Sequence, residues 1–253
     1  MTFIIAEAGV NHGGDFHAAL KLVDAAHGAG ADAVKFQLFE SRKLWGDDRI
    51  AHLELSTVQM REVRAYALAT GIEFMCTPFG LEELLFLKPL VKRMKIPSGL
   101  LTNHEMLQAC GAMPVILSTG MSTLTEIQQA LYRLEGDVTL LQCTSSYPCF
   151  VEDVNLLAMP AMGERFGRHY GLSDHTSGIT CAIAAAALGA TVIEKHLTLD
   201  RNLDGPDHAS SITPSEFRAM TTAIAEVGLA LGRPEKRVMS CEQSLRKVWR
   251  EGN

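Results

Sequence analysis

The 253-residue sequence lacks paired cysteines and an excess of positive charge. Its six cysteines lie far apart with no CxxC pair, and a chain of this size needs no disulfide staples, so we expect free thiols in a reducing compartment. Lys and Arg number 23 against 29 Asp and Glu, which gives a net charge of −6. This balance offers no general attraction to phosphate backbones or anionic membranes, and we expect no nucleic-acid partner.

A leader segment and a membrane-length apolar run are also missing. Met1 and Thr2 lead directly into the apolar run Phe3 to Ile5, with no basic region and no cleavage site. The most apolar stretch, Ile179 to Leu188, is interrupted by Gly189 and falls well short of the roughly 20 residues that cross a bilayer. We therefore expect a cytoplasmic protein with no membrane partner.

The sequence does contain short β-rich runs that alternate with helical patterns about every 30 residues, which predicts parallel βαβ units. The predicted strands are Ile4 to Val10, Ala33 to Phe39, Glu73 to Cys76, Arg93 to Pro97, Val115 to Ser118, Thr139 to Cys143, His169 to Ser173 and Thr191 to His196. The predicted helices are Phe16 to Ala29, Leu55 to Thr70, Leu81 to Leu90, His104 to Cys110, Leu124 to Leu134, Asn155 to Phe166, Ile179 to Leu188 and Pro214 to Leu231.

This count of strand–helix pairs predicts the α/β class and, within it, a single-domain (β/α)8 TIM barrel. An open doubly wound sheet is the alternative, but the segment Gly9 to Gly13 after the first strand lacks the GxGxxG spacing of a dinucleotide-binding turn. We place the barrel at residues 1–232. Residues 233–253 form a polar tail in which the apolar group around Leu245 to Trp249 predicts a loosely docked helix.

Polar side chains interrupt the predicted strands. Strands of a parallel barrel are buried on both faces, so such a side chain is costly unless it is paired or functional. They all lie toward the C-terminal ends of their strands and are Glu7, Lys35, Gln37, Thr77, Lys95, Ser98, Ser118, Ser173, His175, Glu194 and His196. Any one alone is more often a structural ion pair, but barrel enzymes place their chemistry at this end, so the convergence predicts a functional site.

Two histidines, His175 and His196, end adjacent predicted strands and could present their imidazoles to one point. A two-histidine site completed by water and a carboxylate suits a divalent ion such as Mn²⁺, and Zn²⁺, Co²⁺ or Fe²⁺ would tolerate the same ligands. We therefore predict a divalent metal cofactor, with Mn²⁺ as the first candidate and Mg²⁺, Co²⁺ or Zn²⁺ as alternatives.

Lysines and hydroxyls at the same barrel mouth predict an anionic ligand. Lys35 and Lys95 supply two cations. The hydroxyls are those of Thr77, Ser98 and Ser118. Because hydrogen bonds to charged groups contribute roughly 1.5 to 3 kcal/mol each, we expect a phosphorylated or polycarboxylate ligand. Lys195 is turned away from this group by strand alternation, and we expect it to pair with a carboxylate under the helices.

Several strings in the sequence are specific enough to point to a family. They are IIAEAGVNHGGD, AGADAVKFQLF, STGM, CTSSYP, GLSDHTSG, ALGATVIEKHLTLD and GPDHASS. In this order, from Ile4 to about Leu231, they resemble the sialic acid synthases, the phosphoenolpyruvate-condensing enzymes that build nonulosonic acids. The resemblance implies a barrel in which phosphoenolpyruvate adds to the open-chain aldehyde of a sugar such as N-acetylmannosamine, with release of phosphate.

The resemblance also implies roles for individual residues. The positions that match the family's metal ligands are His175 and His196. The positions that match its phosphoenolpyruvate site are Lys35, Thr77, Lys95, Ser98, Ser118 and Ser173. The catalytic positions around the condensing carbons match Glu7, Tyr147 and Glu194. We assign acceptor binding to Gln37, Ser145 and Asp207, of which Ser145 stands where the family usually has an asparagine beside the phosphate.

The sequence departs from the family pattern in three places. Leu100 stands where the family usually has a glutamate that handles the attacking water, so we expect a less acidic and more apolar acceptor pocket, with Glu105 as the neighbouring carboxylate that could replace it. The segment between Phe39 and Leu55 is shorter than usual. The family's C-terminal antifreeze-like domain, whose partner-chain arginine reaches over the sugar, would lie beyond Asn253. We expect a homodimer, and either a separate protein over the barrel mouth or an acceptor other than N-acetylmannosamine.

The leading interpretation is a metal-dependent synthase that joins phosphoenolpyruvate to an aldehyde sugar and gives a 3-deoxy-2-keto acid. A Schiff-base aldolase is one alternative, but it needs a desolvated lysine on a strand, and the sixth strand, Thr139 to Cys143, has none. A non-catalytic or partner-dependent barrel that binds a sugar is the other alternative.

Overall fold

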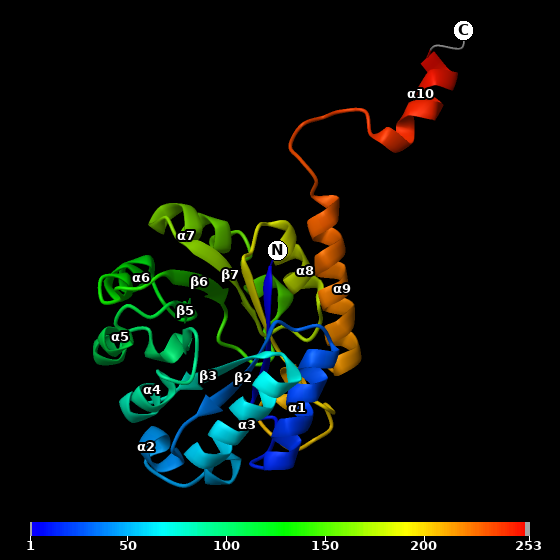
Figure 1. Ribbon diagram of the computed structural model, residues 1–253. Helices are drawn as coiled ribbons and strands as arrows, with labels where there is room; N and C mark the ends of the chain where they lie inside the picture. Colours follow the sequence, from blue (N-terminus) through cyan, green and yellow to red (C-terminus); the bar gives the residue numbers. More distant parts are fainter. Residues whose placement is uncertain (1, 251–253) are drawn as a thin grey trace.

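The structure is a computed structural model that describes residues 2–250. Within these residues, eight parallel strands form one sheet in the order β3-β2-β1-β8-β7-β6-β5-β4. The edge strands β3 and β4 lie against each other, so the sheet curls into a nearly closed barrel (Figure 1). The strands are β1 (Phe3–Gly9), β2 (Ala33–Leu38), β3 (Glu73–Pro78), β4 (Met94–Ile96), β5 (Val115–Ser118), β6 (Val138–Cys143), β7 (His169–Asp174) and β8 (Val192–His196).

Helices surround the strands on all sides (Figure 1). They are α1 (Phe16–Gly28), α3 (Thr57–Thr70), α4 (Leu81–Leu87), α5 (His104–Cys110), α6 (Leu124–Leu131), α7 (Ala158–Phe166), α8 (Thr180–Ala187) and α9 (Pro214–Ala230). The predicted (β/α)8 barrel is confirmed, with element ends shifted by a few residues. The prediction missed α2 (Ser41–Trp45), because a five-residue helix is too short to show an amphipathic period.

Helix starts are encoded locally. Helices α3, α6 and α9 each begin with a capping box, in which a hydroxyl side chain and the residue three positions later satisfy each other's backbone N–H groups. In α9 the cap is Thr213, its partner is Glu216, and Pro214 occupies the first turn. Each such cap stabilises the helix by about 1 kcal/mol.

The barrel interior is filled at its lower level by one apolar layer. Its members are Ile5, Ala33, Met75, Ile116, Leu141 and Val192. Two residues further along the same strands, on the same face, come Glu7, Lys35, Thr77, Ser118, Cys143 and Glu194. The apolar layer therefore forms a solid base, and the layer above it, which we call the polar layer, faces the C-terminal mouth of the barrel.

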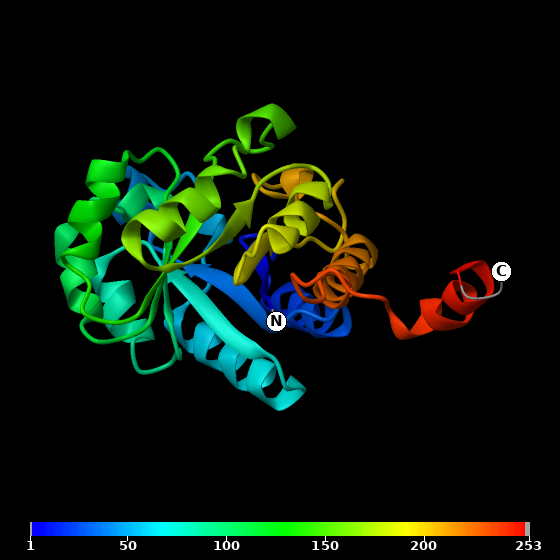
Figure 2. The same cartoon turned by 90° about the horizontal axis from the view of Figure 1, so that it is seen from above.

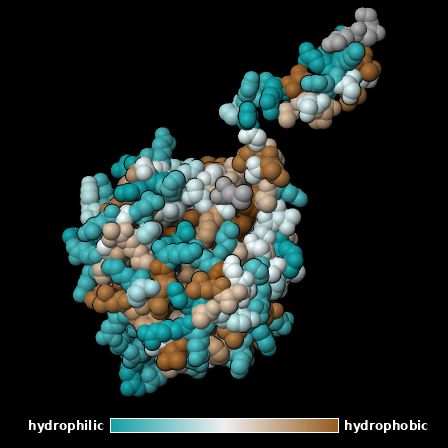
Figure 3. Space-filling model, in the orientation of Figure 1, coloured by the Kyte–Doolittle hydropathy of each residue, from teal (hydrophilic) through white to brown (hydrophobic). Residues whose placement is uncertain are grey.

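The C-terminal tail stands clear of the barrel. Residues 231–250 are exposed throughout, and α10 (Gln243–Arg250) extends away from the barrel in two perpendicular views (Figures 1 and 2). Its apolar side chains Leu245, Val248 and Trp249 lie open to solvent, and Figure 3 shows apolar and polar surface side by side on the tail. The expectation of a docked helix is therefore wrong, because no described barrel residue covers this face. No helix within residues 2–250 has both the length and the apolar character needed to span a bilayer.

Candidate active site

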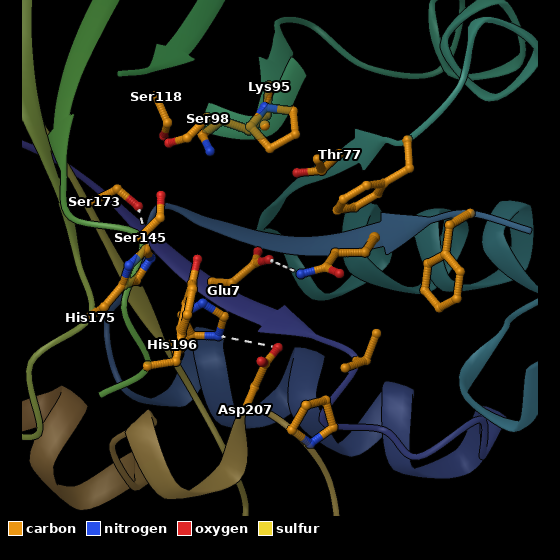
Figure 4. A pocket seen from close by; sticks show the side chains of 18 of the residues that line it. Glu7, Thr77, Lys95, Ser98, Ser118, Ser145, Ser173, His175, His196 and Asp207 are labelled. Atoms are coloured by element: carbon orange, nitrogen blue, oxygen red, sulfur yellow. Dashed lines mark hydrogen bonds and ion pairs between the residues drawn. The ribbon is translucent and has the colours of Figure 1, made fainter. Parts of the chain in front are cut away.

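A cavity of about 580 Å³ opens at the C-terminal ends of the strands. All of the residues predicted for the site line it, from every strand of the barrel or the loop that follows it (Figure 4). They are Glu7, Lys35, Gln37, Thr77, Lys95, Ser98, Ser118, Ser145, Tyr147, Ser173, His175, Glu194, His196 and Asp207. The fold thus brings together side chains that are up to 200 positions apart in the sequence.

The centre of the polar layer is a buried network of ion pairs. The ammonium of Lys35 lies 3.1 Å from Glu7 Oε2 and 3.2 Å from Glu194 Oε2, and the ammonium of Lys95 lies 3.2 Å from Glu194 Oε1. The hydroxyl of Ser173 donates to Glu194 Oε1 at 2.9 Å. All of these side chains are at least 95 per cent buried, so each charge depends on its partners for stabilisation.

The two carboxylates differ in their protonation. Burial raises the pKa of Glu7 and prevails over the opposing effect of Lys35. Burial also acts to raise the pKa of Glu194, but Lys35 and Lys95, helped by the hydroxyl of Ser173, outweigh it and lower this pKa. Glu194 therefore stays ionised, while Glu7 accepts a proton more readily. When the pKa values of two neighbouring carboxyl groups are shifted in opposite directions, one group can act as an acid and the other as an electrostatic stabiliser.

Unsatisfied donors mark the side of the cavity next to Lys95. Among residues 2–250, the hydroxyl of Ser118 is buried without a hydrogen-bond partner. The hydroxyl of Ser98 accepts from the backbone N–H of Gly120 at 3.0 Å, and its own proton can be donated elsewhere. Figure 4 shows Lys95, Ser98 and Ser118 grouped at one side of the cavity. A cation with neighbouring free hydroxyls suits a phosphate or carboxylate group.

The imidazoles of His175 and His196 lie at the opposite side, with ring centroids 5.6 Å apart. The carbonyl oxygen of Thr144 lies 2.8 Å from Nδ1 of His175 and orients this ring. Within the described residues, Nδ1 of His196 is buried without a hydrogen-bond partner, and the nearest carboxylate oxygen, from Asp207, is 3.8 Å away. Burial lowers the pKa of His196 to about 4, so its ring is neutral at neutral pH, the form in which imidazole binds a metal.

These features fit a divalent ion. Residues 2–250 contain no group of three or more His, Cys, Asp or Glu side chains arranged to hold one. A divalent ion held by His175 and His196 would have two side-chain ligands here and would need water or substrate at its remaining positions. The ring of Tyr147 lies tilted against the His175 ring, with the two centroids 4.1 Å apart, and lines this side of the cavity.

Sequence reasoning missed Cys143, which also lines the cavity. Its sulfur lies 3.9 Å from Nδ1 of His175. Burial works against the thiolate, but His175 and Ser98 outweigh it and lower the pKa of Cys143. Strand alternation could have found this residue, because it is the last in its strand and lies two positions beyond Leu141 of the apolar layer.

Sequence reasoning also missed an apolar face of the cavity, which we call the apolar wall. It consists of Val10, Phe39, Leu44, Trp45, Ile50, Leu53 and Phe79. Phe39 and Phe79 lie two positions beyond Gln37 and Thr77, so alternation could have placed them at the mouth. The residues from the loop between β2 and α3 carried no such signal.

The expected effect of Leu100 is wrong. Leu100 ends the short 3-10 helix η2 (Ser98–Leu100), packs against the main hydrophobic core and does not line the cavity. The turn directs Ser98 and Gly99 toward the cavity, so the residue that follows them faces elsewhere. Glu105 is exposed on α5 and is also outside the cavity. The apolar face of the cavity is the apolar wall instead.

The expected partner of Lys195 is confirmed behind the site. Its ammonium lies 2.9 Å from Asp174 Oδ2, and both side chains are fully buried. It also donates to the backbone carbonyl of Thr176, while Asp174 Oδ1 accepts from the Thr176 N–H at 2.9 Å. This buried pair ties the end of β7 to β8, the two strands that present His175 and His196.

A (β/α)8 barrel with lysines, histidines and paired carboxylates gathered at its C-terminal mouth is the arrangement of a barrel enzyme. Comparison with known proteins identifies the family. Residues 22–236 match the NeuB family, and the chain belongs to it.

Named relatives agree with this assignment. The chain is 41 per cent identical over 270 residues to the N,N'-diacetyllegionaminic acid synthase of Campylobacter jejuni, covering 96 per cent of this chain and 81 per cent of that one. It is 36 per cent identical over 269 residues to the human N-acetylneuraminate-9-phosphate synthase, covering 96 and 74 per cent. A crystal structure of the sialic acid synthetase of Leptospira borgpetersenii, in complex with citrate, superposes with a TM-score of 0.91 at 34 per cent identity, covering 98 and 92 per cent. The predicted class, a synthase of the sialic acid synthase type, is confirmed.

Proposed function

We propose that this protein condenses phosphoenolpyruvate with the open-chain aldehyde of a sugar, with the aid of a divalent metal ion, to give a 3-deoxy-2-keto acid and phosphate. The observation that carries the proposal is the convergence of all the predicted site residues on one cavity, with cations and hydroxyls at one side and imidazoles at the other. The names of the NeuB relatives, which are synthases of legionaminic and neuraminic acids, support it.

The donor side would hold phosphoenolpyruvate. Lys95 and the unpartnered hydroxyl of Ser118 suit an incoming anion. Lys35 balances the negative charge of the neighbouring carboxylates of Glu7 and Glu194. We also assign Thr77, Ser98 and Ser173 to phosphoenolpyruvate, and of these Ser173 already donates its proton to Glu194 Oε1. Binding in a buried site strengthens each of these charge-assisted hydrogen bonds relative to water.

The reaction follows from the polarity of the two substrates. The methylene carbon of phosphoenolpyruvate attacks the aldehyde carbon, and a new carbon–carbon bond forms while the aldehyde oxygen takes up a proton and becomes a hydroxyl. Water adds to the resulting cationic carbon and loses one proton, which leaves a hydroxyl and the phosphate ester on the same carbon. The bond from that carbon to the phosphate oxygen then breaks while the hydroxyl loses its proton and becomes the 2-keto group, and phosphate leaves. His175 and His196 would hold a divalent ion, with Mn²⁺ as first candidate, and the bound ion would supply Lewis-acid polarisation of the aldehyde carbonyl.

The two carboxylates take different parts in this scheme. Glu194 stays ionised, so we assign it to stabilising the cationic carbon. Glu7 has a raised pKa and accepts a hydrogen bond from Gln37 at 3.0 Å, so we assign it to carrying the proton. Gln37, Tyr147 and Asp207, with Ser145, border the space left for the acceptor.

A phosphate-release assay tests the proposal. Purified protein would be incubated with phosphoenolpyruvate and a panel of aldehyde sugars, with Mn²⁺ or with a chelator, and the product would be weighed by mass spectrometry. We expect one phosphate for each product molecule, and none after chelation. A Schiff-base aldolase would instead keep its activity without metal and lose it to borohydride in the presence of substrate, and a non-catalytic barrel would release no phosphate.

Two further expectations stay with this proposal. We propose a cytoplasmic enzyme, which is consistent with six free cysteines in the described chain, five of them buried. We also propose a homodimer, or a separate protein over the barrel mouth. Light scattering on the purified chain, alone and after addition of a cell extract, would distinguish these arrangements from a monomer.

A further inference from the structure

We propose that the apolar wall is a specificity subsite, which binds the acylated and deoxygenated end of an uncharged acceptor sugar and disfavours an acceptor that carries a phosphate. This inference rests on the proposed function, because it concerns the second substrate of the same cavity. It makes the wall, rather than the polar layer, the part of the molecule that chooses the acceptor.

The wall continues outward from the polar layer along the same strands. Phe39 and Phe79 follow the polar residues of β2 and β3, and Val10 follows β1. An acceptor whose aldehyde lies between the imidazoles and Glu7 can place its far end against these side chains, because they line the same cavity. Because the wall and the polar layer line one cavity, the occupant of the wall is the co-substrate.

The wall is held together by its own packing. Val10, Phe39 and Leu53 are buried as a small cluster separate from the main core, and other wall residues pack against it. The rings of Phe39 and Phe79 meet edge to face with centroids 6.1 Å apart. A surface held by its own packing needs no ordering when the sugar arrives, which lowers the cost of binding.

Trp45 extends the wall toward solvent. Its side chain is 56 per cent exposed, far more than expected for a large apolar residue unless something covers it. It lies at the edge of the cavity, where an indole ring can cover the carbon face of a sugar or an acetyl methyl group. The guanidinium of Arg49 lies 5.5 Å from the ring centroid and holds its orientation.

Within residues 2–250, no unpaired Lys or Arg side chain stands beside the wall to receive a second phosphate. In the described segment 40–56, each Lys or Arg already pairs with an acid: Arg49 donates to Asp47 at 2.8 and 2.7 Å, and Arg42 pairs with Asp48. Lys43 lies 2.8 Å from Glu40 and 2.6 Å from Glu82. The cations deeper in the cavity belong to the donor side. A phosphate at the far end of the acceptor would lose its hydrating water beside the wall and would gain no unpaired cation in exchange.

The chemistry of the products makes this choice concrete. Phosphoenolpyruvate adds three carbons, so the sixth carbon of a hexose acceptor becomes the ninth carbon of the product. A product with a 9-phosphate therefore needs a phosphorylated acceptor, whereas a product with two N-acetyl groups needs an acceptor rich in methyl groups. Each methyl group placed in an apolar pocket changes kcat/KM by about tenfold or more. The wall suits the second kind of acceptor.

Kinetics with three acceptors tests the inference. These are a diacetamido-6-deoxyhexose, N-acetylmannosamine and N-acetylmannosamine 6-phosphate. We expect kcat/KM to fall in that order, by about tenfold at the first step. Trp45→Ala should shrink the ratio between the first two by several-fold without changing KM for phosphoenolpyruvate. Trp249→Ala is the matched control, because it removes the other exposed tryptophan, which lies on the tail and away from the cavity. A preference for the phosphorylated acceptor, or an unchanged ratio in Trp45→Ala, would overturn the inference.

A gain-of-function variant adds a second test. Leu44→Lys places an unpaired cation on a half-exposed position of the wall and should raise relative kcat/KM for the phosphorylated acceptor. If it does not, although the variant still turns over N-acetylmannosamine, the wall does not contact the far end of the acceptor.

A binding measurement separates this inference from the proposed function. The sequence has two tryptophans, so Trp249→Phe leaves Trp45 as the sole reporter. If no acceptor supports phosphate release, the proposed function fails. The wall proposal still stands if Trp45 fluorescence ranks the diacetamido sugar as the tightest ligand and the phosphorylated sugar as the weakest, and it fails if that order is lost or reversed.

Discussion

The polar layer and the apolar wall line one cavity and arise from the same strand ends, yet they differ in almost every physical property. The polar layer is charged and buried, with Lys35 and Glu7 only 3 and 2 per cent exposed. The wall is uncharged and partly open, and the ion pairs beside it are exposed. Under the two proposals above, the difference teaches that this barrel separates chemistry from recognition: reacting groups need a desolvated charged setting, and an acceptor needs a shaped apolar surface.

The difference also predicts unequal responses to mutation. Removing one partner of a buried ion pair leaves an uncompensated charge in a low-dielectric setting, whereas an exposed pair is screened by water. Changes in or under the polar layer should therefore affect stability and catalysis strongly. Changes at the wall should act on acceptor choice alone.

The largest expected effect concerns the buried pair behind the polar layer. Asp174→Asn leaves the Lys195 ammonium buried without its countercharge, and we expect the free energy of unfolding to fall by about 3 to 5 kcal/mol. Asp47→Asn is the matched control in the segment of the wall, where the exposed pair with Arg49 should contribute about 1 kcal/mol or less. Urea denaturation of both variants measures the difference. Equal losses would remove the distinction between the two regions.

The next effect concerns the imidazoles. His175→Ala and His196→Ala should each lower kcat/KM about a thousandfold, since a bound ion that polarises a carbonyl supplies several kcal/mol. Calorimetric titration with Mn²⁺ should show lost binding in both variants. His104→Ala, at an exposed position on α5, should bind Mn²⁺ normally. Normal Mn²⁺ binding and turnover in both site variants would show that these histidines are not the ligands.

A smaller effect is expected at the donor side. Lys95→Ala leaves a bound anion short of one cation, and the affinity for phosphoenolpyruvate should fall roughly tenfold to a hundredfold. Lys43→Ala removes a lysine of equal charge beside the wall and should leave this affinity unchanged. Calorimetry with phosphoenolpyruvate compares the two variants. Unchanged affinity in Lys95→Ala would contradict the assignment of the donor side.

The same contrast explains what the sequence could predict. The polar layer was predictable because strands alternate, so Lys35 and Gln37, or Glu194 and His196, must share a face, and polar residues in buried strands are conspicuous. The eight-fold alternation predicted the barrel for a similar reason. The alternation of side chains along a strand and the expected burial of that strand can both be inferred from the linear sequence.

The wall residues in the loop between β2 and α3 were not predictable, because the loop has neither a regular period nor the burial expected of a strand. Trp45 and Ile50 belong to a segment of short turns, where spacing does not determine direction. Leu100 shows the same limit: it is two positions from Ser98, but the 3-10 turn between them sends one side chain to the cavity and the other to the core. The sequence correctly predicted a helix at α10. It could not show that the barrel leaves the apolar face of this helix uncovered.

The most direct test of the division between the two regions is a kinetic cycle with the wild type, Lys95→Ala, Trp45→Ala and the double variant, each with two acceptors. The account predicts that Lys95→Ala raises KM for phosphoenolpyruvate and leaves the acceptor ratio intact, that Trp45→Ala does the reverse, and that the double variant shows the product of the two effects. If Trp45→Ala raised KM for phosphoenolpyruvate as much as Lys95→Ala does, or if Lys95→Ala changed the acceptor ratio, the separation of chemistry from recognition would be contradicted.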